Sequence, residues 1–387
     1  MKQALVGAKI FTGDKFIDNQ ALIIDGETLI LTAENDNVVQ LCEIINLDGG
    51  ILAPGFIDLQ VNGGGGAFFT NDTSVSALQT MLNGHRPSGT TSMLPTLISD
   101  TRDTHQAGVS AVRDAIAQGM HGVLGIHIEG PFFDMEKRGA HNARYIREME
   151  PADTAWLTEI DGNFKTMITL APEHAHPGQI KTLVDAGLIV CAGHTNAQYE
   201  QVMAGVKEGI SGFTHLYNAM RPLTGREPGV VGAALDSDET WCAIICDNHH
   251  VHPGAVRAAR NAKPTGKLYL VTDAMSTVGS EQKSFTIYGE TIYEQDGALV
   301  NAEGRLAGSA IGMIDAVRIC HQDVGVELGE CLRMASLYPA QYLQLDNLLG
   351  HIATGLRADL VHFDSNFNVR NTWVAGAHQS HTSVESK

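Results

Sequence analysis

Four residues of the sequence have types and positions that suit hydrolysis at a metal ion. Each stands where an apolar run ends: Glu129 in "HIEGPFF", His194 in "AGHTN", His215 in "FTHLYNAM" and Asp273 in "VTDAM". Two imidazoles and one carboxylate are the ligands of an open catalytic zinc site, in which the pKa of the bound water falls to about 7. We therefore predict that Glu129, His194 and His215 hold a metal ion and that Asp273 acts as the proton shuttle of the reaction.

Each of these residues also has an ordinary explanation when it is taken singly. A lone histidine is more commonly a polar residue than a metal ligand, and an acidic residue at a strand end often caps a helix. Only the combination favours catalysis, and it suits amide hydrolysis and ring deamination equally well. A phosphosugar-binding scaffold without activity is a further alternative. Such a scaffold, however, has no reason to keep a complete set of metal ligands together with a proton shuttle.

These side chains can meet only if the apolar runs end at one place. From Pro54 onward the chain alternates apolar runs with helix-like stretches such as 197–209, which is typical of repeated βα units. We predict an α/β fold with a closed (β/α)8 barrel of the TIM type, whose strands end at a common mouth. No GxGxxG follows the first run, which disfavours an open dinucleotide-binding sheet. The eight expected strands are 55–61, 90–96, 122–128, 166–172, 188–194, 212–216, 241–247 and 268–273.

The two ends of the chain have a different pattern from the middle. Residues 1–52 contain short alternating runs, "ALVGAKIF", "NQALIIDGETLI" and "CEIINLDGG", which predict antiparallel strands. After residue 350 the runs "ADLVHFD" (358–364) and "TWVAGAH" (372–378) have the same character. We therefore predict that 1–52 and 351–387 together form a small discontinuous β-sandwich domain, and that the barrel occupies 53–350.

Charge and composition exclude several classes of protein. The 387 residues include 26 basic and 44 acidic side chains, and a net charge of −18 argues against nucleic acid or an anionic membrane as the partner. The N-terminus lacks the apolar run of a signal peptide, and no stretch is long enough to cross a bilayer. The six cysteines contain no CxxC pair. We expect a cytoplasmic protein with reduced thiols.

Three further segments are candidates for ligand contact. The glycine-rich run "NGGGG" (62–66) could cradle a phosphate, although a flexible loop is the simpler interpretation. The run "DNHHVHP" (247–253) contains His249, His250 and His252, which could form a second metal site, but contact of one histidine with the ligand is the favoured interpretation. Arg221 and Arg226 could supply the positive charge that a phosphate needs, and solvated loop arginines are the alternative interpretation.

Several motifs together resemble the N-acetylglucosamine-6-phosphate deacetylases of the amidohydrolase superfamily. They follow one another along nearly the whole chain, and the segment 335–364 is similar to the C-terminal pattern of the superfamily. The motifs are "PGFIDLQVNG", "GIHIEGPF", "GAHN", "GHTNA", "THLYNAM", "VTDAM" and "LAGSA".

The resemblance implies roles for named residues. One divalent metal ion per subunit, usually zinc, would be held by Glu129, His194 and His215, and Asp273 would act first as general base and then as general acid. His141 would polarise the acetyl carbonyl, and Arg226 would bind phosphate across the interface of a homodimer. The remaining substrate contacts implied by the resemblance are Ala140, Asn218, Ala219, His250, Leu306, Ala307 and Gly308.

One departure from the wider superfamily affects the number of metals. Many members have a His-x-His pair after the first barrel strand, where this chain has Gln60 and Asn62. Loss of two strong ligands favours a single metal ion, with Gln60 in weak contact with the metal or its water. We expect hydrolysis of N-acetyl-D-glucosamine 6-phosphate to D-glucosamine 6-phosphate and acetate. The alternatives are the galactosamine epimer as substrate or another amidohydrolase reaction such as deamination.

Overall fold

A parallel eight-stranded sheet forms the larger body of the molecule. The computed structural model describes residues 2–160, 162–295, 297–302 and 304–381. The strands pair in sequence order from β8 to β17. The barrel closes where the N–H of Asp273 donates to the carbonyl of Gln60 at 3.0 Å, next to a parallel bridge between Val61 and Ala274. The (β/α)8 prediction is confirmed. The strands are β8 Phe56–Val61, β11 Thr90–Leu97, β12 Gly125–Glu129, β13 Lys165–Leu170, β14 Ile189–Ala192, β15 Gly212–Phe213, β16 Trp241–Ile245 and β17 Leu268–Val271.

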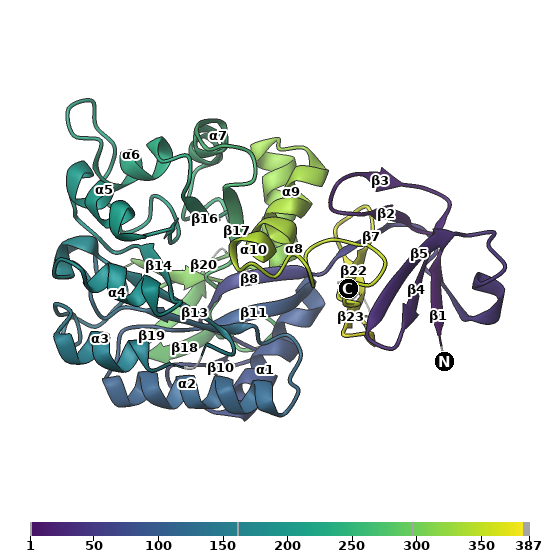
Figure 1. The fold of residues 1–387 in the computed structure, drawn as a ribbon, viewed down its shortest axis with the longest axis horizontal. Coiled ribbons are helices and arrows are strands. Elements are labelled where there is room, and N and C mark those ends of the chain that lie inside the picture. The colour runs from purple at the N-terminus through teal and green to yellow at the C-terminus, as the bar shows by residue number, and fades with distance from the viewer. Residues whose placement is uncertain (1, 161, 296, 303, 382–387) are drawn as a thin grey trace.

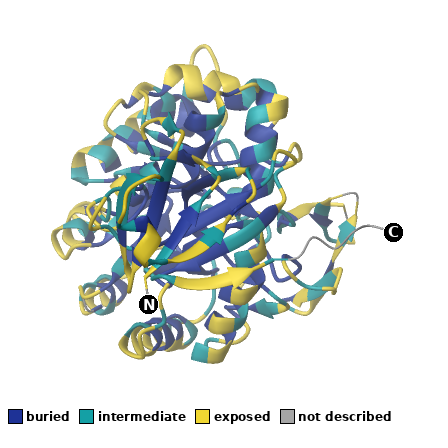
Figure 2. Cartoon of the chain, turned by 90° about the vertical axis from the view of Figure 1, so that its right-hand side faces the viewer, coloured by how far each residue is buried: buried dark blue, intermediate teal, exposed yellow. Residues whose placement is uncertain are grey.

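Helices follow the strands and surround the sheet (Figure 1). The buried residues gather in the strands, and the outer faces of the helices are exposed (Figure 2). The helix expected over 197–209 is α5, Tyr199–Glu208, and it ends at Gly209, whose φ of 117° is one that glycine adopts without strain. The other helices are α1 Val75–His85, α2 Arg102–Ala117, α3 Pro151–Thr158, α4 Gln179–Asp185, α6 Gly229–Asp236, α7 Pro253–Ala262, α8 Met313–Ile319, α9 Leu328–Ala335 and α10 Leu337–Tyr342.

A four-stranded antiparallel sheet, which the sequence did not predict, lies between β17 and α8. We call it the cover sheet; it consists of β18 Ser284–Ile287, β19 Glu290–Gln295, β20 Ala298–Val300 and β21 Leu306–Ser309. Its buried Ile287, Ile292 and Leu299 share a hydrophobic cluster with Ile98 and Met275, which follow barrel strands β11 and β17. The cover sheet is therefore packed over the C-terminal end of the barrel.

The small β domain combines both ends of the chain, as predicted (Figure 1). Leu5 and Leu22 of one sheet share a hydrophobic core with Leu360 and Trp373 of the other, so the sheets pack face to face. The first sheet has the order β5-β4-β1-β6 and the second β24-β23-β22-β7-β2-β3. Their strands are β1 Gln3–Val6, β2 Lys9–Phe11, β3 Phe16–Ile17, β4 Gln20–Asp25, β5 Thr28–Ala33, β6 Glu43–Asn46, β7 Ile51–Pro54, β22 Leu360–Phe363, β23 Val369–Val374 and β24 Ala377–Ser380.

Details of this domain differ from the prediction. The pairs β1–β6 and β2–β7 are parallel, so the N-terminal segment is not wholly antiparallel. The run 372–378 is not one strand, because Ala375 and Gly376 have φ of 48° and 79° and turn the chain between β23 and β24. The boundaries 1–52, 53–350 and 351–387 stay a prediction.

The glycine-rich run 62–66 is not a free phosphate cradle, because the N–H groups of Gly63, Gly65 and Gly66 already donate to the carbonyls of Ala274, Val278 and Ser276. Gly63–Gly64 forms the short strand β9, which pairs with β10, Ala67–Phe68, and both of these glycines are buried.

Within the described chain, no helix combines the length and the apolar character that a membrane span requires.

Candidate active site

Three of the predicted residues converge at the C-terminal mouth of the barrel. Glu129 ends β12, His194 follows β14 and His215 follows β15, and all three are at least 95% buried. Oε1 of Glu129 lies 3.2 Å from Nε2 of His194 and 3.1 Å from Nε2 of His215. The two Nε2 atoms are 3.0 Å apart. The structure therefore places the three predicted ligand atoms around one point.

The donor set fits a divalent metal ion. Nδ1 of His194 lies 2.8 Å from the carbonyl of Lys137, so the proton of the neutral ring is on Nδ1 and a lone pair on Nε2 faces the Glu129 oxygen. Two acceptors this close repel each other unless a cation lies between them. Zinc bonds of about 2.0–2.1 Å in a tetrahedron give ligand separations of about 3.3 Å, close to those observed. Glu129 and His194 also form a candidate metal group with His141.

The backbone is strained at the residues that converge. His194, His215 and Asp273 have φ of 50°, 34° and 53°, in the left-handed region that costs about 1–3 kcal/mol for a residue with a Cβ. Tyr217 and Ala219 share this region, with φ of 80° and 52°. The strand expected over 212–216 is therefore only Gly212–Phe213. Such strain is typical of functional sites.

Asp273, the predicted proton shuttle, is held by neutral amides. Nδ2 of Asn62 donates to its Oδ1 at 2.7 Å, and Nε2 of Gln60 donates at 3.2 Å. The same amide of Gln60 lies 3.1 Å from Oε1 of Glu129, so it joins the two carboxylates. Burial and the charge of Glu129 raise the pKa of Asp273 to about 7, against the opposing effect of His215 and His250. A carboxyl that titrates near neutrality can serve as both base and acid.

Glu129 remains ionised beside it. Burial favours the neutral acid, but in the absence of a metal ion protonated imidazoles of His194 and His215 bring the pKa of Glu129 well below its usual value, and a divalent cation held by neutral imidazoles would act in the same direction. The two carboxyl groups of the site thus have pKa values that are driven apart, which is typical of acid and base pairs with separate tasks.

His141 is oriented by Ser99, a residue that the sequence analysis did not select. The N–H of Ser99 donates to Nδ1 of His141 at 3.1 Å, so the proton of the neutral ring lies on Nε2. Burial and the neighbouring His194 lower the pKa of His141 well below its usual value, which keeps the ring neutral. Ser99 follows β11, so the same rule of polar residues at strand ends would have found it.

Most of the predicted substrate contacts line one cavity of about 180 Å³, which we call the inner lobe. Ala307 does not line it, because β21 alternates its faces and directs Ala307 into the hydrophobic cluster under the cover sheet. Arg226 is exposed on the loop before α6 and does not line it either. The predicted residues that line the inner lobe are Glu129, Ala140, His141, His194, His215, Asn218, Ala219, His250, Asp273, Leu306 and Gly308.

The three histidines of the run after β16 have different surroundings and roles. Nδ1 of His250 lies 2.6 Å from Oδ2 of Asp247, and although burial lowers the pKa of His250, Asp247 raises it above its usual value. Nδ1 of His252 instead accepts from the N–H of Gly254 and caps α7. His249 is not in a candidate metal group of the described chain either. Only His250 lines the inner lobe.

A second candidate metal group, Asp134, Glu173 and His174, lies behind the site and is half-buried. The Glu173 carboxylate already accepts from Oγ1 of Thr195 at 2.6 Å and from the N–H of Asn196 at 2.7 Å. These bonds fix the loop that carries His194. The group therefore supports the site through hydrogen bonds.

The fold and this constellation define a class of enzyme, and comparison with known proteins agrees. The model of the amidohydrolase family matches residues 51–378, and the chain belongs to that family.

Relatives within the family have more specific names. N-acetylgalactosamine-6-phosphate deacetylase of Shewanella sp. (strain ANA-3) is 44% identical over 331 residues, which cover 85% of this chain and 83% of that protein. N-acetylglucosamine-6-phosphate deacetylase of Haemophilus influenzae is 38% identical over 379 residues, covering 97% and 99%. The crystal structure of N-acetylglucosamine-6-phosphate deacetylase from Pasteurella multocida superposes with a TM-score of 0.94 at 39% identity, covering 98% of this chain and 100% of that chain.

Proposed function

We propose that this amidohydrolase hydrolyses N-acetyl-D-glucosamine 6-phosphate to D-glucosamine 6-phosphate and acetate, in the catabolism or recycling of amino sugars. The observation that carries the proposal is the convergence of Glu129, His194 and His215 beside the carboxyl group of Asp273, which the amides of Asn62 and Gln60 hold in place. The names of the relatives support the substrate class.

Glu129, His194 and His215 would hold one divalent ion, zinc in our proposal, which activates water and polarises the acetyl carbonyl. Gln60 would contact the metal or its water only weakly. Asp273 accepts the proton of the attacking water at its carboxylate and returns it to the leaving nitrogen. Because the proton of His141 is on Nε2, this ring can donate a hydrogen bond to the carbonyl oxygen as negative charge develops there, a contribution typically worth about 10²–10³ in rate.

The phosphate would lie at the opposite side of the inner lobe. The backbone around Asn218 and Ala219 and the His250 ring, whose pKa Asp247 raises, would contact it, and the loop of Ala140 and Leu306 would enclose the sugar. We also propose a homodimer in which Arg226, which is exposed and does not line this chain's own inner lobe, reaches the neighbouring site. We further propose a cytoplasmic location, supported by six free cysteines.

Acetate release tests the reaction. The purified protein should contain about one zinc ion per chain, release acetate from the phosphorylated sugar, lose that activity after chelation and regain it when zinc is added back. Binding of the sugar phosphate without acetate release would contradict the proposal and support a scaffold. Ammonia release from a purine base would support a deaminase.

The epimer of the sugar is the second candidate, because the 44% identical relative is named for galactosamine. The two epimers differ only at one hydroxyl of the ring, so kcat/KM for each, measured side by side, decides between them. A larger kcat/KM for the galactosamine compound would replace the proposed substrate while leaving the reaction unchanged.

A further inference from the structure

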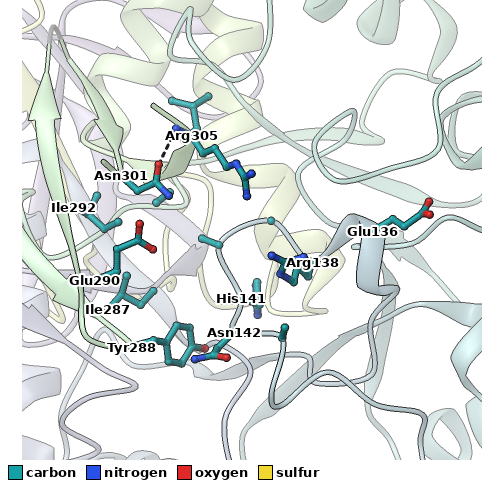
Figure 3. A pocket seen from close by; sticks show the side chains of 15 residues that line it. Glu136, Arg138, His141, Asn142, Ile287, Tyr288, Glu290, Ile292, Asn301 and Arg305 are labelled. Carbon is teal, nitrogen blue, oxygen red and sulfur yellow. Dashed lines mark hydrogen bonds between the residues drawn. The ribbon is translucent and has the colours of Figure 1, made fainter. Parts of the chain in front are cut away.

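A larger cavity of about 660 Å³ adjoins the inner lobe; we call it the outer lobe, and Figure 3 shows the side chains that line it. The two lobes are neighbours, because the same five residues line both. The outer lobe has a size within the range of about 300–1,000 Å³ that is typical of small-molecule sites, whereas the inner lobe of about 180 Å³ is smaller. The shared residues are Gly139, Ala140, His141, Ile287 and Leu306.

The proposed monosaccharide does not need the outer lobe. In the proposed function, the acetyl group lies between the metal site and His141, and the phosphate lies at Asn218, Ala219 and His250. Of these residues only His141 also lines the outer lobe, and the sugar ring would meet that lobe only at Ala140 and Leu306, which line both. The space beyond Ala140 is therefore left for another part of a ligand.

The charges of the outer lobe balance. Among the described residues that line it, the permanently charged side chains are Arg138 and Arg305 of one sign and Glu136 and Glu290 of the other, while His141 and Tyr288 are neutral. Glu290 lies in β19 of the cover sheet, and Arg138 lies in the loop on the facing side (Figure 3). A second anion would meet repulsion as well as attraction here, so the lobe does not select one.

The mixture of groups suits hydroxyls instead. Arginine only donates hydrogen bonds and a carboxylate only accepts them, while the amides of Asn142 and Asn301 do both. A hydroxyl group also does both, so a polyhydroxyl ligand can use every kind of partner. Leu306, which is 37% exposed, adds apolar surface for the C–H groups of a sugar ring.

We propose that the outer lobe binds a second, uncharged sugar unit joined to the phosphorylated amino sugar, so that the enzyme also deacetylates phosphorylated disaccharides. This inference rests on the proposed function, because that function places the phosphorylated unit in the inner lobe.

The test compares acetate release from four substrates. They are N-acetylglucosamine 6-phosphate and its three derivatives with a neutral hexose on O1, O3 or O4. At least one derivative should have a kcat/KM about tenfold above that of the monosaccharide, which corresponds to about 1.4 kcal/mol of added binding in the transition state.

Two variants test whether the higher kcat/KM of the derivative depends on the outer lobe. Ala143→Trp fills the outer lobe from an exposed position, and Glu290→Gln removes a charged acceptor. Both should lose most of the advantage of the derivative and keep the monosaccharide rate within about twofold. The matched control Glu281→Gln, at an exposed position that lines neither lobe, should change neither rate.

The outcomes separate the two proposals. Turnover of the monosaccharide without any better derivative overturns the outer-lobe inference and leaves the proposed function standing. A preferred derivative whose rate is unchanged in both outer-lobe variants overturns the inference as well. Absence of acetate from all four substrates overturns the proposed function itself.

Discussion

Two aspartates of this molecule, Asp273 at the mouth of the barrel and Asp153 at the start of α3, have opposite surroundings. Asp153 is fully buried and accepts from Nη2 of Arg102 at 2.6 Å and from Nη2 of Arg147 at 2.7 Å. Against the effect of burial, these cations lower its pKa to about 2. Asp273 accepts hydrogen bonds from the neutral amides of Asn62 and Gln60 and faces Glu129, and without a metal ion burial and Glu129 raise its pKa to about 7.

The difference shows how one residue type serves two purposes. Permanent cations beside Asp153 fix one protonation state, so that this carboxylate can only support the structure. Neutral amides beside Asp273 tolerate both states, because an amide N–H can donate to a carboxylate and to the carbonyl oxygen of a neutral acid. In the proposed function, Asp273 therefore lacks the electrostatic stabilisation of Asp153 and can exchange a proton.

Asp273→Asn should produce the largest effect. The amide cannot take a proton from water, so kcat should fall by about 10²–10⁴, while metal content and Tm stay near those of the wild type. Acetate release, metal analysis and thermal melting measure the three quantities. A variant that keeps more than a tenth of the activity would show that Asp273 is not the shuttle.

Asp153→Asn should instead lower stability and leave catalysis intact. Loss of the charge leaves Arg102 and Arg147 without a strong partner. We therefore expect the free energy of unfolding to fall by about 2 kcal/mol. Denaturant unfolding gives this free energy, and kcat per folded molecule should stay within twofold. A large loss of kcat at unchanged stability would contradict the division of tasks between the two aspartates.

The pH dependence of stability should show the contribution of the ion pairs of Asp153. The pKa of Asp153 is about 2 in the folded chain and about 3.9 in an unfolded one, so its contribution is complete above about pH 4 and is lost as the pH falls toward 2. The difference in stability between wild type and Asp153→Asn should shrink over that window in urea titrations. A difference that stays constant from pH 5 to 2 would be inconsistent with the ion pair.

Arg102→Gln should have the smallest effect. Arg147 binds Asp153 through both of its terminal nitrogens, whereas Arg102 contributes one, and about a third of each arginine side chain is exposed. We expect a loss of about 0.5–1 kcal/mol for Arg102→Gln and a larger loss for the matched variant Arg147→Gln. A larger loss for Arg102→Gln than for Arg147→Gln would mean that the number of hydrogen bonds does not decide the strength of these ion pairs.

Sequence reasoning found the part of the site that follows from topology. The carboxyl ends of parallel strands must meet, so Glu129, His194 and His215 could be read from where apolar runs stop. The same reasoning could not give the orientation of His141, because that depends on a hydrogen bond to Ser99 far from it in sequence.

The cover sheet was missed for a different reason. Its strands are three to six residues long and partly exposed, so their alternation is too short to separate them from loops. The outer lobe, which lies between this sheet and the loop of Arg138, was therefore beyond prediction as well.

The seam of the barrel has a consequence for when activity can arise during synthesis. The backbone of Asp273 closes the barrel against Gln60, which lies 213 residues earlier in the chain, and Asp58 joins the same strands through Oγ1 of Thr272. Contacts this distant in sequence form late, after a large loss of chain entropy. A nascent chain that has not yet emerged beyond β17 therefore contains Glu129, His194 and His215 but neither the seam nor Asp273, so the proposed proton shuttle joins the site only when the barrel closes.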